Sequence, residues 1–367
     1  MILRFQSSWV VKKGVKDIVE VSSSLKMKKY EIMSKNPFVY IFLKSLSEGI
    51  KYPEDLPDIA KKYCLKEKFV NSLISKFKSY GILIEDEKII SPPLDTIYDR
   101  QIRFFRTFEH QTLSGEQIND NLQNRTILIV GLGGYGSWTG LLCARMGIRN
   151  IIGVDFDSVE ITNLHRQILY DRGDLGSLKV NACKKKINEA DPEINFTGHC
   201  LKVTAPEDLY PLMDEVDLVF NPFSYIPEKK ALNHPAGILA QAAIIKRKPC
   251  LTFGGSWIGP LTIPGKTPCY FCTIKALELK NINIDHDLRS QHIQKRAFAP
   301  PIAACCSLAV YEASRFLSGS DDSQVLKGMI QLDIFSFSNS RFLPLELNLD
   351  CAFCIPHAQD NFKGTHE

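Results

Sequence analysis

A glycine-rich segment between two apolar stretches constrains the fold of this chain more than any other feature. The preceding run Thr126–Val130 predicts a short buried strand, and Trp138–Met146 predicts a helix. Four glycines separate them: Gly131, Gly133, Gly134 and Gly136. Glycines allow a tight turn and let backbone N–H groups approach a phosphate, to which the helix N-terminus adds the positive end of its dipole. The segment therefore predicts a phosphate-binding turn, and the alternative is a close-packed turn without a ligand.

Strands and helices alternate after this turn. Asn150–Val154, Ile194–His199 and Val216–Phe220 are typical of strands, and Lys179–Glu189 is typical of a helix. Near-continuous apolar strands that alternate with helices indicate a parallel sheet with both faces covered. We therefore expect an α/β protein with a Rossmann-like, doubly wound sheet.

The residues after the second strand help to distinguish the possible nucleotides. Asp155 ends that strand, at the position where a ribose hydroxyl pair is held. Arg166 and Lys179 follow, within Asn-Leu-His-Arg-Gln and Gly-Ser-Leu-Lys. A nicotinamide dinucleotide needs no cations there, whereas the β- and γ-phosphates of a triphosphate do. The set favours ATP, although either cation alone could be an ordinary surface charge.

These segments together resemble the adenylating domain of the ThiF/MoeB family, which includes the ubiquitin-activating enzymes. The resemblance covers about residues 95–360 and implies an E1-like fold that activates a carboxylate with ATP and Mg²⁺. It implies that Arg166, Lys179 and Arg100 support catalysis, with Arg100 reaching the ATP of the other subunit in a homodimer. The residues that it implies for ATP binding are Gly131, Gly133, Gly134, Gly136, Ser137, Asp155, Asp157, Asn163 and Gln167.

One position departs from the family pattern. An aspartate that holds Mg²⁺ usually follows the fourth strand, and Ser224 takes its place here. A serine is a poor substitute for a carboxylate on a hard cation. We expect either Asp157 or Asp217 to contribute instead, or the metal requirement to differ.

Four of the eleven cysteines form two Cys-x-x-Cys pairs: Cys269 with Cys272, and Cys351 with Cys354. Two such pairs predict a closed four-cysteine site for structural Zn²⁺, and a redox role is the alternative. The resemblance agrees, because many relatives carry zinc at these places. Lys275–Arg296, where thioester-forming relatives carry a nucleophilic cysteine, contains none, so covalent thioester catalysis is not expected.

The other seven cysteines mostly occur in apolar surroundings, which favours small core residues over reactive thiols. They are Cys64, Cys143, Cys183, Cys200, Cys250, Cys305 and Cys306.

Residues 1–93 predict a separate N-terminal domain, with residues 94–367 forming the adenylation domain. Short strands within residues 1–35 precede three expected helices, at Phe38–Leu46, Leu56–Tyr63 and Lys66–Tyr80, and a hairpin over residues 82–90. This order predicts a winged-helix-like module. It resembles the leader-recognition element of peptide-modifying enzymes, in which a precursor adds a strand to an exposed edge. A role in dimerisation or DNA binding is the alternative.

The net charge of +4 is concentrated in the N-terminal quarter. Residues 1–95 hold 17 basic and 12 acidic side chains, which is too weak an excess for a nucleic-acid-binding protein. No segment is typical of a signal peptide, and glycines interrupt the longest uncharged run, Thr126–Ala144. We therefore expect a cytoplasmic protein that binds neither nucleic acid nor membrane.

The complete layout resembles the peptide-modifying branch of the family, of the microcin C and pantocin A types. The resemblance implies ATP-dependent activation of a carboxylate, by adenylation or phosphorylation, on a ribosomally made precursor peptide in peptide antibiotic biosynthesis. Ser224 favours a subsequent cyclisation over stable attachment of the nucleotide. One alternative is activation of a ubiquitin-like sulfur carrier. Another is a non-catalytic subunit that delivers a leader peptide, against which the intact glycines, Arg166 and Lys179 argue.

Overall fold

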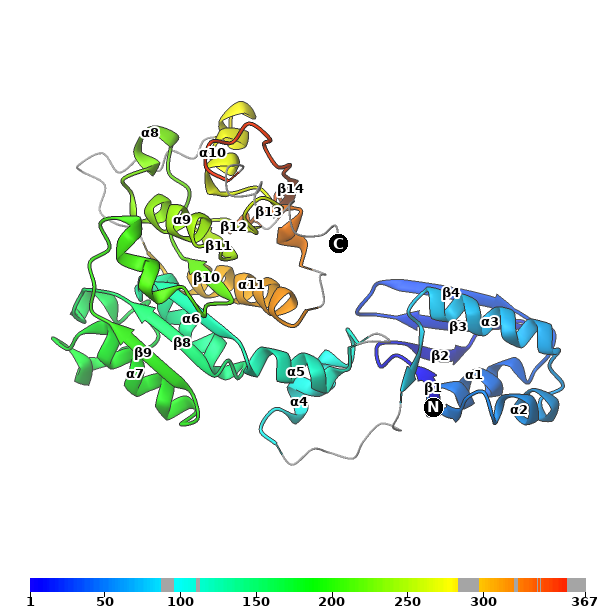
Figure 1. Cartoon of the computed structure of the whole chain (residues 1–367). Helices are drawn as coiled ribbons and strands as arrows, with labels where there is room; N and C mark the ends of the chain where they lie inside the picture. Colours follow the sequence, from blue (N-terminus) through cyan, green and yellow to red (C-terminus); the bar gives the residue numbers. More distant parts are fainter. Residues whose placement is uncertain are drawn as a thin grey trace, which may run out of the picture. The chain divides into compact units, whose positions relative to one another are not determined.

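The computed structural model (Figure 1) describes residues 1–86, 96–109, 113–282, 297–319, 323–334, 336 and 338–354. It contains two compact units, Met1–Asp120 and Asn121–Glu367, which are described separately. The expected domain boundary after residue 93 falls outside the described residues and stays a prediction.

The first unit combines two small sheets with helices. Its strands are β1 (Ile2–Phe5), β2 (Val10–Lys13), β3 (Ile18–Ser23), β4 (Lys28–Met33), β5 (Ile50–Lys51) and β6 (Leu83–Asp86). Its helices are α1 (Val39–Glu48), α2 (Leu56–Lys62), α3 (Glu67–Ser79) and α4 (Asp99–Phe105), while α5 (Gly115–Gln123) contains the division between the units. The sheets have the orders β5-β1-β6 and β2-β3-β4. The three expected N-terminal helices are present.

The strands of the first unit differ from the prediction in two ways. β4 was not expected as a separate strand, because its alternation is mostly polar and it lies at a sheet edge. β6 pairs antiparallel with β1, while the second half of the expected hairpin, residues 89–90, lies outside the described residues.

A buried arginine ties the first strand to two later segments of this unit. Arg4 lies 2.8 Å from Glu109 and 2.7 Å from Asp86. Arg4 and Glu109 are both buried, so each ion compensates the other's loss of hydration.

The second unit contains one sheet of eight strands. These are β7 (Thr126–Val130), β8 (Asn150–Val154), β9 (Asn195–His199), β10 (Leu218–Asn221), β11 (Cys250–Gly254), β12 (Trp257–Thr262), β13 (Gly328–Gln331) and β14 (Arg341–Pro344). The helices are α6 (Gly134–Arg145), α7 (Lys179–Ala190), α8 (Glu228–Ala231), α9 (Pro235–Ile245), α10 (Tyr270–Leu279) and α11 (Ala299–Leu317). Short 3₁₀ turns lie at η1 (Ile161–Asn163), η2 (Arg172–Asp174), η3 (Pro206–Leu212) and η4 (Gln324–Leu326).

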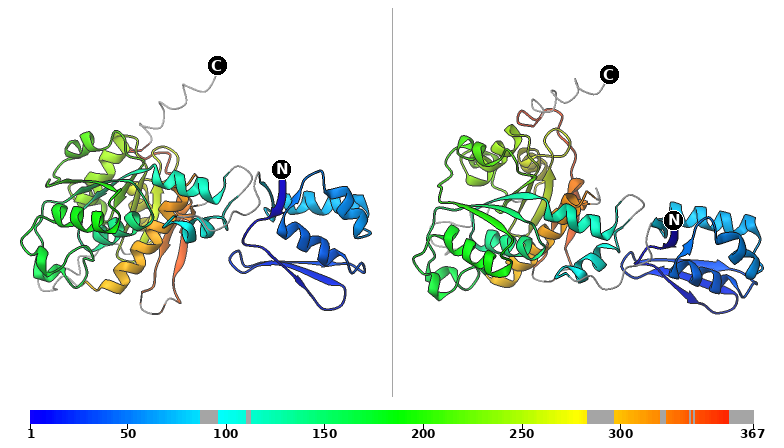
Figure 2. Two further views of the ribbon diagram at one scale, coloured as in Figure 1. Left: turned by 90° about the horizontal axis from the view of Figure 1, so that it is seen from below. Right: turned by 60° about the horizontal axis from the view of Figure 1, so that its bottom comes forward.

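The strand order β14-β13-β12-β11-β10-β7-β8-β9 confirms the expected doubly wound α/β fold. The chain runs outward from β7 to β9 and then returns to the other side of β7 at β10. α6, α7 and α11 pack on one face, while η3 and α9 cover the other, so the sheet lies between two helical layers (Figure 2). A crevice is expected at the carboxyl ends of β7 and β10, where the winding reverses.

The alternation of strands and helices predicted a parallel sheet, but part of the sheet is antiparallel. The pairs β11-β12, β12-β13 and β13-β14 are antiparallel. Only two residues connect β11 to β12, and a connection that short permits a hairpin but not a parallel crossover. In the described part of the chain, no helix has the length and apolar character needed to cross a membrane.

Candidate functional site

The glycine turn follows β7 at the reversal point of the sheet. α6 begins at Gly134 rather than at Trp138, so the last two glycines belong to its first turn. Gly131 has a φ of +89°, and a Cβ there would lie 2.9 Å from the ring of Phe223. A Cβ on Gly136 would lie 1.8 Å from the carbonyl oxygen of Gly131. The turn therefore requires glycine at both positions, and it brings the N-terminus of a twelve-residue helix to the crevice.

Asp155 links the end of β8 to this turn. Its two carboxylate oxygens accept hydrogen bonds from the N–H of Leu132, at 2.7 Å, and from the N–H of Asp157, at 2.8 Å. Burial raises the pKa of Asp155, while these backbone bonds and the charge of Lys179 oppose the rise. The carboxylate is therefore fixed beside the glycine turn, where the second lone pairs of its oxygens can still accept from a ligand.

Lys179 is paired inside the site. Its Nζ lies 2.8 Å from Asp157 Oδ2, and its side chain is 6% exposed, against 50% for Asp157. The backbone N–H of Lys179 also donates to the carbonyl of Asp157. A phosphate that bound Lys179 would have to replace or share this carboxylate.

The segment after η1 lies against the glycine turn. A Cβ on Gly134 would be 3.9 Å from Arg166 Cδ, and one on Gly133 would be 3.9 Å from Gln167 Nε2. The Arg166 guanidinium donates to the carbonyl of Thr162, and the residue is half-buried. Gln167 is buried, and its Oε1 has no hydrogen-bond partner among the described residues.

The side chains of two other predicted site residues form hydrogen bonds with nearby backbone groups. The side-chain oxygen of Asn163 accepts from the N–H of Glu160 at 3.0 Å and caps η1. Ser137 is fully buried, and its hydroxyl donates to the carbonyl of Gly134 at 3.2 Å.

Arg100 lies in the first unit, on α4, and is exposed. Its predicted contact with a nucleotide of another subunit stays a prediction.

The two aspartates considered as replacements for the missing carboxylate lie at opposite ends of the strands. Asp157 follows β8 at the carboxyl edge, with the glycine turn. Asp217 precedes β10 at the amino edge, where it accepts from Thr126 N–H and from Arg125. The expectation that Asp217 could serve the site is therefore wrong.

Three aromatic residues of the site were not predicted. The Trp138 indole N–H donates to the carbonyl of Arg166 at 3.0 Å, and Phe223 covers Gly131. The hydroxyl of Tyr135 accepts from the N–H of Gly255 at 2.9 Å. For Tyr135 and Trp138 the only signal in the sequence was a position inside or beside the glycine motif, and Phe223, 92 positions after Gly131, lacks even that signal.

The two cysteine pairs meet in one buried cluster. Sγ–Sγ distances are 3.6 Å for Cys269–Cys272, 3.7 Å for Cys269–Cys351 and 3.6 Å for Cys272–Cys354, and all four lie within 4.8 Å of one another. Four sulfurs at about 2.3 Å from a tetrahedral ion lie roughly 3.8 Å apart, far beyond disulfide distance. The donor set therefore fits Zn²⁺, with no position left open.

Hydrogen bonds inside the cluster distribute the protons unequally. The hydrogen bond with Cys269 lowers the pKa of Cys351, whereas the hydrogen bonds with Cys272 and Cys351 raise the pKa of Cys269. The stacked rings of Phe271 and Phe353, 3.9 Å apart, pack against the same cluster.

The remaining cysteines divide by burial. Five are buried, as expected for core residues: Cys143, Cys183, Cys250, Cys305 and Cys306. Burial raises the pKa of Cys305 to about 12, so this thiol stays protonated. Cys64 and Cys200 are exposed, contrary to the expectation for the set.

The strand order and the glycine turn define a doubly wound α/β protein, a class in which ligands bind outside the carboxyl ends of the strands. The chain belongs to the ThiF family, whose model matches residues 98–352. The family resemblance predicted from the motifs is thereby confirmed.

Known proteins match different shares of the chain. The sulfur carrier protein ThiS adenylyltransferase of Escherichia coli is 26% identical over 257 residues, which cover 70% of this chain and 94% of that protein. Against the mosquito adenylyltransferase and sulfurtransferase MOCS3 (Culex quinquefasciatus), 29% identity extends over 43% of this chain but only 35% of the relative.

Two solved structures extend the likeness to nearly the whole chain. E. coli MccB, in a crystal structure with MccA-N7isoASN, has a TM-score of 0.75 at 19% identity and covers 97% of this chain and 100% of its own. PaaA has a TM-score of 0.65 at 17% identity, with 92% and 99% covered. At these identities the likeness concerns the fold.

Proposed function

We propose that this protein uses MgATP to activate a carboxylate of a ribosomally made precursor peptide. The observation that carries the proposal is the fold likeness to MccB, which spans 97% of the chain and so includes the N-terminal module as well as the ThiF unit. MccB structures are described in complex with MccA and with ATP. The ThiS adenylyltransferase, by contrast, matches 70% of this chain.

In the proposed reaction, a peptide carboxylate oxygen bonds to the α-phosphorus of ATP. The bond from that phosphorus to its bridging oxygen breaks, and pyrophosphate leaves. A nucleophile on the same peptide then attacks the activated carbonyl carbon, and AMP leaves. The cyclic product has lost one water relative to the peptide. Attack at the γ-phosphorus would release ADP instead, so the nucleotide product identifies the phosphorus attacked.

The glycine turn and the residues beside it at the carboxyl edge of the sheet form the glycine-turn edge. These residues have separate tasks in this proposal. The first turn of α6 and the cations Lys179 and Arg166 neutralise the phosphates, and Asp155 accepts from the ribose hydroxyls. Arg100 would add charge from a second subunit of a homodimer. Mg²⁺ would use the phosphate oxygens, water and Asp157, since Ser224 offers no carboxylate. The four cysteines would hold Zn²⁺ as a structural ion that takes no part in the chemical step.

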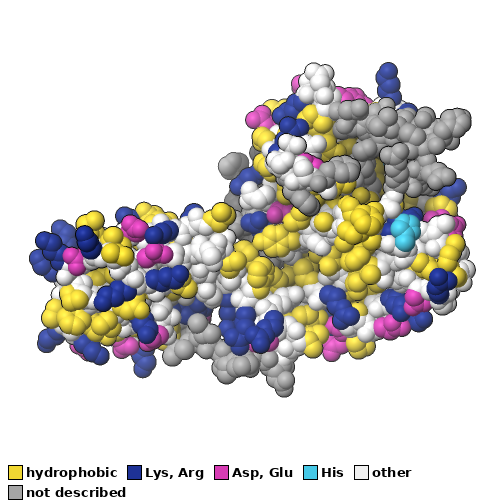
Figure 3. Space-filling view, turned by 180° about the vertical axis from the view of Figure 1, so that it is seen from behind, with side chains coloured by type: hydrophobic (Ala, Val, Ile, Leu, Met, Phe, Trp, Pro, Cys, Tyr) yellow, Lys and Arg dark blue, Asp and Glu magenta, His cyan; other side chains and the backbone are white. Residues whose placement is uncertain are grey.

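We propose that the first unit binds the leader part of the peptide. β4 is an edge strand of the described β2-β3-β4 sheet, so its outer backbone groups can pair with an added strand. Residues 10–35, which form this sheet, contain seven lysines and three acidic residues, and basic side chains recur over the surface of this unit (Figure 3). An acidic leader would be attracted to this sheet.

The test is peptide-dependent ATP turnover. The peptide encoded by a short reading frame beside the gene is incubated with enzyme and MgATP, and its mass is measured. Loss of one water indicates cyclisation, and gain of one nucleotide monophosphate indicates stable adenylation. An unchanged peptide mass without ATP consumption contradicts the proposal.

A sulfur-carrier substrate is the second candidate, favoured by the match to the ThiS adenylyltransferase. It predicts ATP–pyrophosphate exchange that depends on a small protein ending in Gly-Gly. Comparing the two substrates in one exchange assay separates the candidates.

A further inference from the structure

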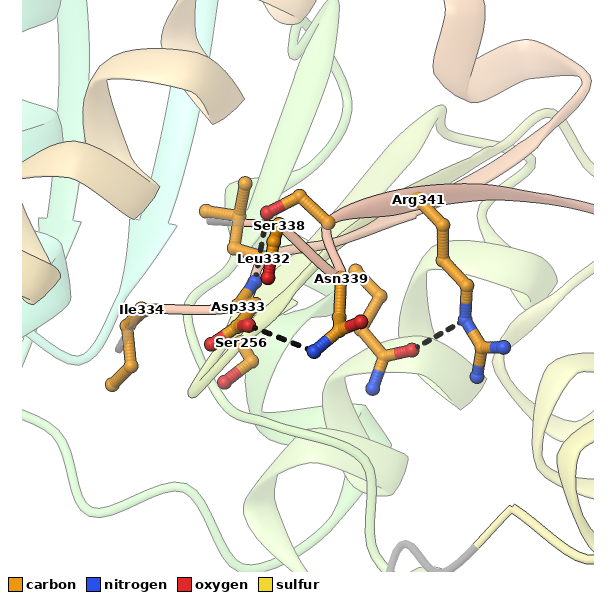
Figure 4. Close-up of a pocket in the computed structure, with 9 residues that line it drawn as sticks. Ser256, Leu332, Asp333, Ile334, Ser338, Asn339 and Arg341 are labelled. Atoms are coloured by element: carbon orange, nitrogen blue, oxygen red, sulfur yellow. Dashed lines mark hydrogen bonds between the residues drawn. The ribbon is translucent and has the colours of Figure 1, made fainter. Parts of the chain in front are cut away.

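A polar cup of about 680 Å³ lies in the second unit, where β13 leaves the sheet and β14 returns. Figure 4 shows the side chains around it. The lining residues are Ser256, Gln331, Leu332, Asp333, Ile334, Ser338, Asn339, Ser340 and Arg341. The volume falls in the range of small-ligand and peptide-side-chain pockets.

The cup opens on the same edge of the sheet as the glycine turn. β11 is parallel to β10 and ends at Gly254, and the chain turns there into antiparallel β12. β13 is antiparallel to β12, with Gln331 opposite Trp257, so β13 also ends at that edge. The cup and the glycine turn therefore belong to one continuous face of the second unit.

Asp333 organises the cup. Its carboxylate accepts from the N–H of Ser336 at 3.2 Å and from the amide of Asn339 at 3.3 Å, and its own N–H donates to the Ser340 hydroxyl at 2.9 Å. Arg341 donates to Gln331 at 2.9 Å on the other side (Figure 4). The walls thus present hydroxyl, amide, carboxylate and guanidinium groups, which suit a hydrogen-bonding ligand rather than an apolar one.

Tyr135 connects the glycine turn to this cup. It lies in the first turn of α6, and its hydroxyl accepts from the N–H of Gly255 at 2.9 Å. The backbone carbonyl of the next residue, Ser256, accepts from the N–H of Leu332 at 2.7 Å. Two hydrogen bonds therefore lead from Tyr135 to the wall of the cup. The α11 thiols support the same path, because Cys306 donates to the Tyr135 carbonyl at 3.3 Å.

The β11–β12 turn also contacts Ser224. A Cβ on Gly254 would lie 3.1 Å from the nitrogen of Ser224, and the preceding Phe223 covers Gly131. Two sets of contacts therefore join the glycine turn to the β11–β12 turn, one through Tyr135 and one through residues 223–224.

We propose that the polar cup binds a polar segment of the peptide substrate, and that Tyr135 is the positioning residue that keeps the cup aligned with the glycine turn. The inference rests on the proposed function for the identity of the ligand. The link from Tyr135 to the cup rests on the contacts alone and can be tested with ATP as the only probe.

The first experiment compares hydrogen–deuterium exchange of wild type and Tyr135→Phe, with and without MgATP. We expect ATP to slow exchange at residues 254–257 and 331–334 of the wild type at least threefold. Tyr135→Phe should keep slowed exchange at the glycine turn and lose it at 331–334. Tyr210→Phe, which alters a half-buried tyrosine on η3, should behave as wild type. Equal protection of 331–334 in wild type and Tyr135→Phe, or none in the wild type, overturns the role of Tyr135.

The second experiment fills the cup. Asn339→Trp should raise the KM for the peptide at least tenfold and leave the KM for ATP unchanged. Lys327→Trp, exposed before the opposite end of β13, is the matched control and should leave both unchanged. An unaltered peptide KM in Asn339→Trp overturns the cup as a binding site. Absence of any peptide-dependent turnover in the wild type instead contradicts the proposed function, while the exchange experiment still tests the coupling.

Discussion

The cysteine cluster and the glycine-turn edge lie in the same unit but differ in how far their groups are already committed. In the cluster, the four sulfurs are buried and spaced as a tetrahedral ion requires, so metal binding replaces only protons. At the glycine-turn edge, Lys179 is paired with Asp157, and Asp155 is bonded by two backbone N–H groups. A nucleotide must exchange partners there. The first region fits an ion that stays bound, whereas the nucleotide proposed for the second would have to displace existing partners.

The strongest test of this comparison removes one sulfur. Cys272→Ser leaves three ligands for the ion, so we expect loss of bound zinc and destabilisation by several kcal/mol, on the order of 5. Metal content and thermal unfolding followed by circular dichroism measure both effects. Cys200→Ser, an exposed cysteine, is the control. A protein purified with no zinc, or an unchanged melting temperature in Cys272→Ser, would show that the cluster is not a metal site.

The next test removes a cation from the glycine-turn edge. Lys179→Ala should lower kcat/KM for peptide-dependent ATP turnover by roughly 100- to 1000-fold, because the proposed reaction assigns this buried cation to the phosphates of ATP. Lys184→Ala, on an exposed face of α7, is the matched control. Undiminished turnover in Lys179→Ala contradicts the phosphate-site assignment, whereas both variants should keep wild-type unfolding.

A pair of glycine variants tests the geometry of the turn. Gly136→Ala would place a methyl group 1.8 Å from the carbonyl oxygen of Gly131, so we expect a loss of about 2–3 kcal/mol in stability. In Gly134→Ala the methyl group would lie 3.4 Å from Ile302 and 3.9 Å from Arg166, which are ordinary contacts, so the free energy of unfolding should change by less than about 0.5 kcal/mol. Denaturant unfolding measures the pair. Equal effects would mean that the turn relaxes freely.

The smallest expected effect concerns competition for Lys179. Asp157→Asn removes the carboxylate that pairs with it, and ATP measured without Mg²⁺ should bind about threefold more tightly, which is about 0.6 kcal/mol. Calorimetry gives the affinity, and Asp171→Asn, which breaks the pair with Lys186, is the control. If Asp157 also binds the metal, turnover by Asp157→Asn should require a higher Mg²⁺ concentration. An unchanged affinity for metal-free ATP would show that the ion pair does not oppose binding.

Local patterns predicted much of this molecule. Apolar runs located β7, β8 and β10, and the four glycines located the turn, because a strand that enters a helix through glycines has few other conformations. The two Cys-x-x-Cys pairs likewise predicted a single site from residues 82 positions apart. The sulfurs of Cys269 and Cys351 lie 3.7 Å apart.

Contacts between distant segments could not be predicted in this way. The antiparallel β12–β14 ribbon depends on pairing across about 70 residues, and no local period reports it. The hydrogen bond between Tyr135 and Gly255 joins residues 120 positions apart in the sequence. Phe223, which covers Gly131, is 92 positions away from it. The ion pair between Lys179 and Asp157 could not be predicted either, because the motifs assigned each residue separately to the nucleotide.

The hydrogen bond from Trp138 to the Arg166 carbonyl gives the molecule an optical reporter. The chain has three tryptophans: Trp9 in the first unit, Trp257 at the start of β12, and Trp138 on α6. The indole of Trp138 contacts the backbone of the residue proposed to meet the phosphates. In a protein with Trp9 and Trp257 replaced by phenylalanine, the remaining emission would follow nucleotide arrival directly, without a label, on the timescale of mixing.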